Sequence, residues 1–308
     1  MRIPIIMDCD PGHDDAIALL MAFASDKLDV RGVTVVGGNQ TLEKNTLNTL
    51  KVLSFAGIKT RVAPGASKPL MRKLIVAPEV HGESGLDGPI LPEPTYGVCG
   101  LSAVELMVDI IKNSKEKITL VPTGPLTNIA MLFMTHPEVK DKIERISLMG
   151  GSAVGGNWTP AAEFNILVDP EAADIVFNSG IPITMCGLDV THKAQIYSED
   201  IERIRAMGGK VAVMVAELMD FFALFHWRFG FKGSPLHDPC AVAWLIDSSL
   251  ITTEHCRVDI ETEGEFTTGA TVADLRPMKR FNCNADVALD IDRERFIDLL
   301  CELLQKYD

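Results

Sequence analysis

The sequence predicts an α/β protein with a mainly parallel, doubly wound (Rossmann-like) open sheet and helices on both faces. Short apolar runs rich in valine and isoleucine alternate with helix-length segments up to about residue 189. Such alternation is typical of right-handed strand–helix–strand units in a parallel sheet. Of the 308 residues, 47% are hydrophobic, which is enough for a sizeable core, and no linker-like composition divides them. We therefore expect one domain over residues 1–308.

The expected strands are short and end in glycine, proline or polar residues, as buried strands do. They cover residues 5–7, 29–36, 59–63, 118–121, 145–149 and 181–185. The helices between them have recognisable starts. Thr41 can cap one helix, and Ser102 with Glu105 forms a capping box for the next. The helices are expected over residues 16–24, 41–56, 102–113, 128–134 and 169–180.

Two long loops interrupt this alternation. Residues 64–100 are rich in proline and glycine, and a second polar loop covers residues 157–165. Long ordered loops in compact domains are usually functional. We therefore expect both loops to border a site.

The pattern changes after residue 189. Helices are expected over residues 198–207 and 210–226, and a turn at 233–239 leads into a third helix, so that 198–250 forms a helical excursion. A hairpin is expected from residues 256–262 and 266–273. A last strand over 286–290 then precedes a C-terminal helix.

Composition excludes several kinds of partner. The formal net charge is −13, which disfavours nucleic acid and anionic membrane surfaces. No apolar run reaches the roughly 20 residues of a membrane span, and no signal peptide is expected. The seven cysteines are scattered without C-x-x-C spacing, as reduced thiols are. These features predict a cytoplasmic protein.

The first strand ends in an unusually acidic turn. Four carboxylates (Asp8, Asp10, Asp14 and Asp15) lie within eight positions and repel one another. A helix dipole favours a carboxylate in the first turn by only about 0.3–1 kcal/mol. A hard cation such as Ca²⁺ or Mg²⁺ would hold such a cluster, since it takes oxygen ligands. The alternative is an acidic start to an ordinary helix.

Polar side chains follow several strands at the same edge of the predicted sheet, where ligands bind in this fold. Asn39 follows the second strand and Thr123 the fourth, and a later turn carries His237 and Asp238. Amide and carboxylate groups suit sugar hydroxyls, and a cation-bound water next to a carboxylate can act as a nucleophile. Carboxylates also stabilise the oxocarbenium-like charge that forms when a glycosidic bond breaks.

The chain resembles the inosine-uridine preferring nucleoside hydrolases. The diagnostic stretch is D-C-D-P-G-H-D-D-A at residues 8–16, which matches the family's D-x-D-P-G-x-D-D signature. Further matches follow in order as G-N at 38–39, P-T-G-P-L-T-N at 122–128, M-G-G at 149–151, G-N at 156–157, A-E-F-N at 162–165 and L-H-D at 236–238.

The resemblance implies hydrolysis of ribonucleosides to ribose and free base, with one Ca²⁺ per subunit. It implies that Asp10 is the general base and a calcium ligand, and that Thr123 binds calcium through its carbonyl. The remaining implied calcium ligands are Asp15 and Asp238. The implied ribose-binding residues are Asp14, Asn39, Asn157, Glu163 and Asn165. A homotetramer is also implied.

His81 and His237 together resemble the pyrimidine-preferring branch, in which a histidine can protonate the departing base. The helix end at residues 225–228 would line the base pocket, with His226 as a base-contacting residue. The other histidines, including His13 and His192, are expected to be structural or exposed. Cys9 is expected in the core.

Other functions stay open at this point. Within the family, purine or broad inosine/uridine preference is the alternative. Outside it, the Asp8-x-Asp10 pair imitates Mg²⁺-dependent phosphohydrolases, and a non-catalytic nucleoside-binding protein would need the same pocket. A phosphohydrolase needs Ser or Thr and Lys donors for phosphate, which tells the two enzyme classes apart.

Overall fold

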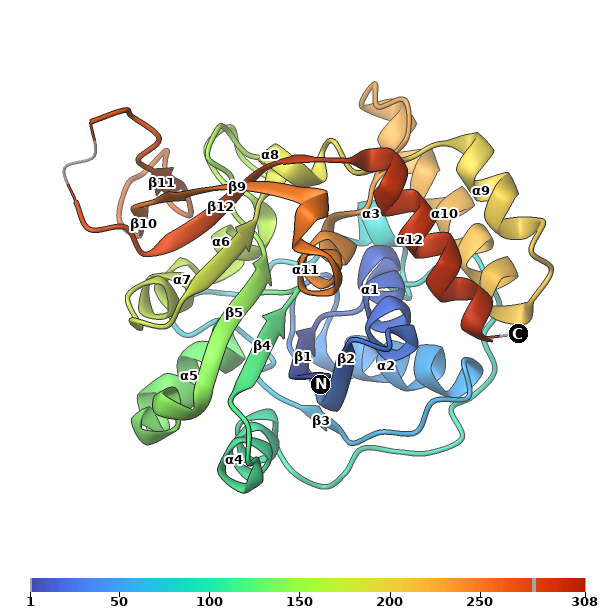
Figure 1. Cartoon of the computed structure of the whole chain (residues 1–308), viewed down its shortest axis with the longest axis horizontal. Coiled ribbons are helices and arrows are strands. Elements are labelled where there is room, and N and C mark those ends of the chain that lie inside the picture. Colours follow the sequence, from blue (N-terminus) through green and yellow to red (C-terminus); the bar gives the residue numbers. More distant parts are fainter. Residues whose placement is uncertain (1, 279–280, 308) are drawn as a thin grey trace.

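A computed structural model, which describes residues 2–278 and 281–307, has one eight-stranded sheet at its centre (Figure 1). Its strand order is β3-β2-β1-β4-β5-β6-β12-β9, and every neighbouring pair is parallel except β12 with β9. The strands are β1 (Ile3–Cys9), β2 (Leu28–Val35), β3 (Val62–Pro64), β4 (Ile118–Pro122), β5 (Ile143–Met149), β6 (Ile183–Cys186), β9 (Ile251–Cys256) and β12 (Ala285–Ile291). The predicted doubly wound sheet is confirmed.

Helices cover both faces of the sheet (Figure 1). On one face lie α1 (His13–Ala24), α2 (Leu42–Phe55), α10 (Lys210–Arg228), α11 (His237–Ile246) and α12 (Arg293–Leu304). On the other lie α4 (Ala103–Asn113), α5 (Thr127–Thr135) and α7 (Pro170–Phe177). Strand alternation explains the two layers, since Ile5 and Met7 of β1 join the first core whereas Ile6 joins the second.

The registers of the central strands bring their carboxyl ends to one edge. Asp8 of β1 is paired with Thr34 of β2 on one side and with Pro122 of β4 on the other. Chain order reverses between β1 and β4, and such a switch point opens a crevice beyond the strand ends. The turns after these three strands therefore meet in space, although they are up to about 110 residues apart in sequence.

The helical excursion is also confirmed, with α9 (Ser198–Arg205) and α10 at the side of the molecule opposite the small sheet of β10 (Val258–Ile260) and β11 (Thr271–Ala273) (Figure 1). The long loop 64–100 contains one short helix that was not expected, α3 (Pro78–His81). Short helices α6 (Phe164–Val168) and α8 (Leu188–Thr191) follow β5 and β6. Both α3 and α6 carry predicted site residues.

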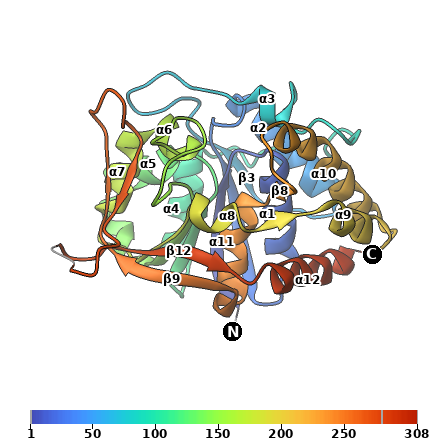
Figure 2. The same ribbon diagram turned by 90° about the horizontal axis from the view of Figure 1, so that it is seen from above.

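The C-terminal region differs in detail from the prediction. The hairpin is shorter, with β10 (Val258–Ile260) antiparallel to β11 (Thr271–Ala273) in a separate sheet. β9 was not expected as a strand, because most of its side chains are polar. It runs antiparallel beside β12 at the sheet edge, and β12 leads directly into α12 (Figure 2). An edge strand exposed on one side needs less apolar sequence than the parallel strands inside. Within the described residues, the helices are all too short or too polar to cross a membrane.

Candidate active site

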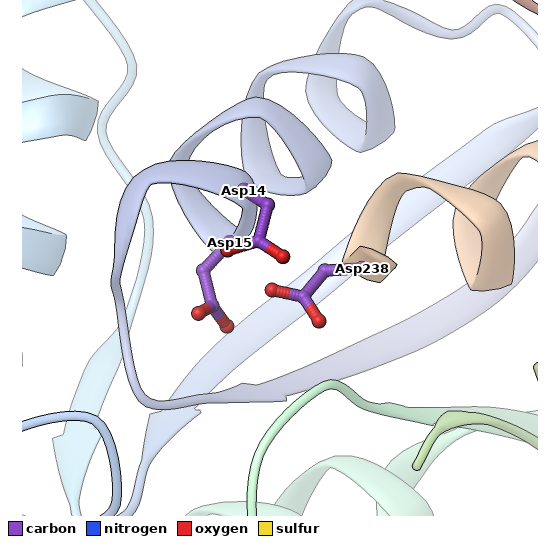
Figure 3. Close-up of side chains that lie close together, drawn as sticks. All are labelled: Asp14, Asp15 and Asp238. Carbon is purple, nitrogen blue, oxygen red and sulfur yellow. The ribbon is translucent and has the colours of Figure 1, made fainter. Parts of the chain in front are cut away.

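Three buried carboxylates converge where two helices begin. Asp14 and Asp15 lie in the first turn of α1, and Asp238 lies in the first turn of α11, which packs against α1. Figure 3 shows the Asp238 side chain reaching toward the other two from the opposite helix. One oxygen from each carboxylate lies within 4.8 Å of the other two. Two helix N-termini stabilise these charges only in part, so the cluster has the composition of a cation site.

Asp15 is held rigidly by its neighbours. Its Oδ1 accepts a hydrogen bond from Thr123 Oγ1 at 2.8 Å, and its Oδ2 accepts from the Gly12 main-chain N–H at 3.1 Å. The Asn39 side-chain amide donates to the same Oδ2 at 3.2 Å. Residues after β1, β2 and β4 thus meet at one carboxylate, as the strand registers require. The Asp15 carboxylate is therefore fixed in position by hydrogen bonds to both of its oxygens.

Asp10 lies beside this cluster in a cradle of small residues. Its Oδ2 accepts the Asn39 main-chain N–H at 2.7 Å. Gly38 packs against one carboxylate oxygen and Gly124 against the other, so that a methyl group at either glycine would collide with Asp10. Its Oδ1 is buried and has no hydrogen-bond partner among the described residues. A buried carboxylate oxygen without a donor is poised to bind a cation or a water molecule.

The acids perturb one another's protonation. Burial, followed by the charge of Asp15, raises the pKa of Asp10 well above its usual range and raises the pKa of Asp14 to about 7. Burial and the charge of Asp14 raise the pKa of Asp238 in the same way. Burial also raises the pKa of Asp8 to about 6, although Thr34 and Asn128 donate hydrogen bonds to it. Without a cation, these carboxylates resist ionising together.

The residues present fit a hard divalent cation. The donor set is all oxygen, namely three clustered carboxylates, the unpartnered Asp10 oxygen and the Thr123 carbonyl. That carbonyl accepts the Asn165 side-chain amide at 2.8 Å and has a second lone pair free. The geometric cluster includes Asp14, to which the resemblance gives ribose contacts, whereas Asp10 lies next to the cluster. All four aspartates are therefore within reach of one small site.

The cluster opens into a cavity of about 530 Å³, a typical size for a small-molecule site. All predicted ribose-binding residues line it, namely Asp14, Asn39, Asn157, Glu163 and Asn165. So do Thr123, Asp238 and the three histidines singled out from the sequence, His81, His226 and His237. Asp10 and Asp15 lie behind this lining.

The polar side chains of the loop after β5 are held in place by hydrogen bonds from main-chain N–H groups. Glu163 accepts the Gly151 and Asn165 main-chain N–H groups, both at 2.9 Å. Burial raises the pKa of Glu163, and these hydrogen bonds oppose the rise. Asn157 accepts the Phe164 N–H at 3.0 Å, which leaves its side-chain NH₂ available. These side chains are oriented before any ligand binds.

The three cavity histidines that were singled out from the sequence each have Nδ1 engaged by a neighbouring group. Nδ1 of His237 lies 2.8 Å from Thr191 Oγ1, and Nδ1 of His226 donates to the Phe222 carbonyl at 2.9 Å. Nδ1 of His81 is contacted by His13. Burial lowers the pKa of His226 to about 4, and it lowers the pKa values of His81 and His237 well below their usual range. Neutral imidazoles with an engaged Nδ1 leave Nε2 for a ligand.

The end of α10 only partly follows the expectation. Phe225 and His226 line the cavity, but Trp227 is 50% exposed and Arg228 is exposed. Consecutive helical residues point about 100° apart, so four in a row cannot share one face. Phe229 and Phe231, beyond the helix, complete the aromatic wall instead.

Two further histidines, which were expected to be structural or exposed, lie in or beside the cavity. His192 lines the cavity and meets His237 edge-on at 5.8 Å between ring centroids. His13 is fully buried against His81. His192 follows the end of a predicted strand and could therefore be expected to border the site, whereas His13 occupies a variable position of the family signature. Cys9 is buried in the core, as predicted.

The cavity carries no cationic anchor for phosphate, since neither lysine nor arginine occurs among its described lining residues. A phosphohydrolase would need such donors around the transferred group. The lining thus opposes the phosphohydrolase alternative.

Comparisons with known proteins agree with this geometry. The family model for "Inosine-uridine preferring nucleoside hydrolase" matches residues 5–298. Pyrimidine-specific ribonucleoside hydrolases of Photobacterium profundum and Shewanella woodyi are each 56% identical over all of this chain, covering 100% and 99% of their own lengths. A purine-preferring ribonucleoside hydrolase from Gardnerella vaginalis superposes with a TM-score of 0.92 at 32% identity, over 99% of this chain and 98% of that one. The chain therefore belongs to the inosine-uridine preferring nucleoside hydrolase family.

Proposed function

We propose that this enzyme hydrolyses the N-glycosidic bond of pyrimidine ribonucleosides, uridine and cytidine, to ribose and free base. The observation that carries the proposal is that one cavity is lined both by the acid cluster and by neutral histidines. Full-length identity of 56% to proteins named pyrimidine-specific supports the base preference. The purine-preferring structure shares the fold at 32% identity, so the fold alone does not select the base.

We assign the cation as one Ca²⁺ per subunit, held by Asp10, Asp15, Asp238 and the Thr123 carbonyl. Ca²⁺ accepts six to eight oxygen ligands in irregular geometry, which suits a cluster that also leaves room for water and sugar hydroxyls. When bound, it would lower the pKa of a water molecule and offset the charge of the aspartates.

The protein's own residues orient the ribose and accept a proton. Asp14 and Glu163 accept hydrogen bonds from sugar hydroxyls, and Asn39, Asn157 and Asn165 complete the set. Asp10 takes a proton from the attacking water as the water oxygen forms its bond to the anomeric carbon. The electron pair of the breaking glycosidic bond leaves with the base. The surrounding carboxylates stabilise the oxocarbenium-like charge on the sugar.

The departing base needs a proton or a hydrogen-bond donor, because its negative charge develops as the bond breaks. His81 and His237 supply it, and His226 contacts the base. His81 lies in α3 within the segment 75–90, and His226 lies near the end of α10 within the segment 220–232, so any closure of these segments over substrate would bring both histidines to the base.

A base-release assay across nucleosides tests the function directly. Uridine and cytidine should be hydrolysed with higher kcat/KM than inosine and adenosine. Deoxyuridine should be at least about 100-fold worse than uridine, because a site built to bind a hydroxyl rejects the analogue without it. Free base and reducing sugar are measured in parallel.

Three outcomes would contradict the proposal. Faster turnover of inosine would overturn the pyrimidine preference. Phosphate release from sugar phosphates without base release would favour a phosphohydrolase. Tight, calcium-dependent nucleoside binding without turnover would indicate a binding protein.

Removal of divalent cations should abolish most activity. Chelated protein should lose at least about 100-fold in kcat, because both water activation and ribose orientation depend on the cation. Ca²⁺ should restore activity and also raise Tm by several degrees, since ligand at about 100 times Kd stabilises the folded state by about 2.7 kcal/mol. Mg²⁺, which demands octahedral geometry, should restore less.

An Asp238→Asn variant is the matched control for chelation. It keeps the shape of the cluster and should lose the calcium-dependent rise in Tm. Full activity of wild-type protein in which elemental analysis detects no divalent metal would refute the cation assignment.

A further inference from the structure

His13 lies at the first position of α1, between the glycine of the acidic turn and Asp14. Its side chain is fully buried. Its Nε2 lies 2.8 Å from the Asp87 carbonyl oxygen, and its Nδ1 lies 3.1 Å from Nδ1 of His81. The latter contact joins residues 68 positions apart. Two imidazoles and a carbonyl therefore form a chain that ends at the cavity.

The direction of the hydrogen bonds in this chain follows from its carbonyl end. A carbonyl oxygen can only accept, so Nε2 of His13 carries a proton. In a neutral imidazole the other nitrogen then has only a lone pair. Nδ1 of His13 must therefore accept, and Nδ1 of His81 must carry the proton that it donates.

The His13 main-chain N–H also points at Nδ1 of His81, at 3.3 Å. If Nδ1 of His81 accepted that N–H, two lone pairs would face each other over the shorter 3.1 Å between the rings. The arrangement with a proton on Nδ1 of His81 instead satisfies the two shorter contacts of the chain.

The surroundings hold both rings in place. His13 stacks on Phe221 and Phe222 with ring centroids 5.3 and 5.2 Å apart and interplanar angles of 4° and 12°. His81 stacks on Phe222 and lies against the Cα of Gly12, where any side chain would collide with its ring. Gly12 has an ordinary negative φ of −96°, so it is needed for space and not for conformation.

All His81 side-chain hydrogen bonds within the described part of the chain are made by Nδ1. Nε2 is the nitrogen left for the cavity, which His81 lines. We propose that His13 is a positioning residue for the leaving-group chemistry, which fixes the neutral His81 with its proton on Nδ1 and its lone pair on Nε2 toward the base. The inference rests on the proposed function of His81.

This arrangement defines where a proton travels. His81 takes a proton at Nε2 from the solvent that reaches the cavity, and it passes this proton to the departing base as the glycosidic electron pair leaves; the proton that Asp10 took from the attacking water returns to solvent, so the number of protons balances. The imidazole is then left neutral with its remaining proton on Nδ1, which is the form that His13 stabilises. No proton has to move between the two ring nitrogens, and His13 itself neither gains nor loses one.

Two substitutions separate hydrogen bonding from packing. His13→Phe keeps a ring between the phenylalanines but removes the acceptor. His13→Asn loses the ring but places an amide oxygen near the former Nδ1. We expect His13→Phe to lose at least about tenfold in kcat for uridine with KM changed less than about threefold. His13→Asn should recover most of that loss.

A second substrate shows whether the effect concerns the leaving group. 4-Nitrophenyl β-ribofuranoside releases 4-nitrophenolate, a stabilised leaving group that needs no proton. His13→Phe should therefore hydrolyse it within about threefold of the wild-type rate. Equal losses on both substrates, or a Phe variant as active on uridine as the Asn variant, would overturn the proposal.

Nitrogen-15 NMR of histidine-labelled protein reads the tautomer without a variant that changes His13. The His81 signal, identified by its absence in His81→Ala, should show a protonated Nδ1 in the neutral form. In His13→Phe, Nε2 should take up some or all of that proton. A proton on Nε2 in the wild-type protein would overturn the proposal, even if His13→Phe does not fold. Failure of wild-type protein to release any base would instead refute the proposed function, and the tautomer would still be measured.

Discussion

Replacement of Asp10 by alanine should leave a folded protein that hydrolyses uridine at least about 1,000-fold more slowly. The change removes the proposed base and one proposed cation ligand together. Asp10 has an unpartnered buried oxygen and repels its acidic neighbours, so its loss should cost little stability. Steady-state kcat and KM with uridine, together with Tm, measure both expectations.

Asp10→Asn separates the two roles, since an amide keeps the shape that fits between Gly38 and Gly124 but cannot accept the water's proton. It should be nearly as slow as the alanine variant. Asp200→Asn is the matched control, because Asp200 is also a buried acid but lies on α9, away from the cavity, where it pairs with Arg293 of α12. It should lower Tm and leave kcat unchanged. A near-native kcat in Asp10→Ala would defeat the assignment of Asp10.

The part of this site that was predictable from sequence is the part encoded by local pattern. An apolar run followed by a polar turn and a helix defines a strand end, and parallel strands put such ends at one edge. For that reason Asn39 and Thr123 could be placed beside the acidic turn, and the structure joins all three through Asp15. Asp238 lies in a turn that no strand rule reaches, and the family's L-H-D match at 236–238 then predicted it to be a calcium ligand.

The unpredicted part depends on how a long loop folds back. His13 looks like an ordinary helix-start residue until α3, inside the 64–100 loop, brings His81 against it. No periodicity encodes a contact between a loop and a helix start. β9 was missed for a related reason, since the polar residues Thr252–His255 belong to an edge strand that water can reach. The expected homotetramer and cytoplasmic location stay predictions.

Replacement of His81 or His237 by alanine should each lower kcat for uridine by about 100-fold while KM changes less than about fivefold. Both side chains line the cavity, and each has its Nδ1 engaged, by His13 and by Thr191 respectively. A group that acts on the departing base contributes mainly in the transition state, so its loss appears in kcat and not in KM. Rates with uridine, cytidine and inosine measure the effect and its dependence on the base.

His136→Ala is the matched control, because His136 is a partly exposed histidine that contacts Glu138 at the surface. It should behave as the wild type. If inosine is the better substrate and neither cavity histidine affects its turnover, the pyrimidine assignment and the leaving-group roles fail together. If KM rises instead while kcat holds, the two histidines bind the base equally in ground and transition states, and the departing base must obtain its proton from water. The double variant His81→Ala/His237→Ala then distinguishes one shared proton path from two separate contacts. If both histidines act on the same proton, the fold loss in kcat of the double variant will be much smaller than the product of the two single losses.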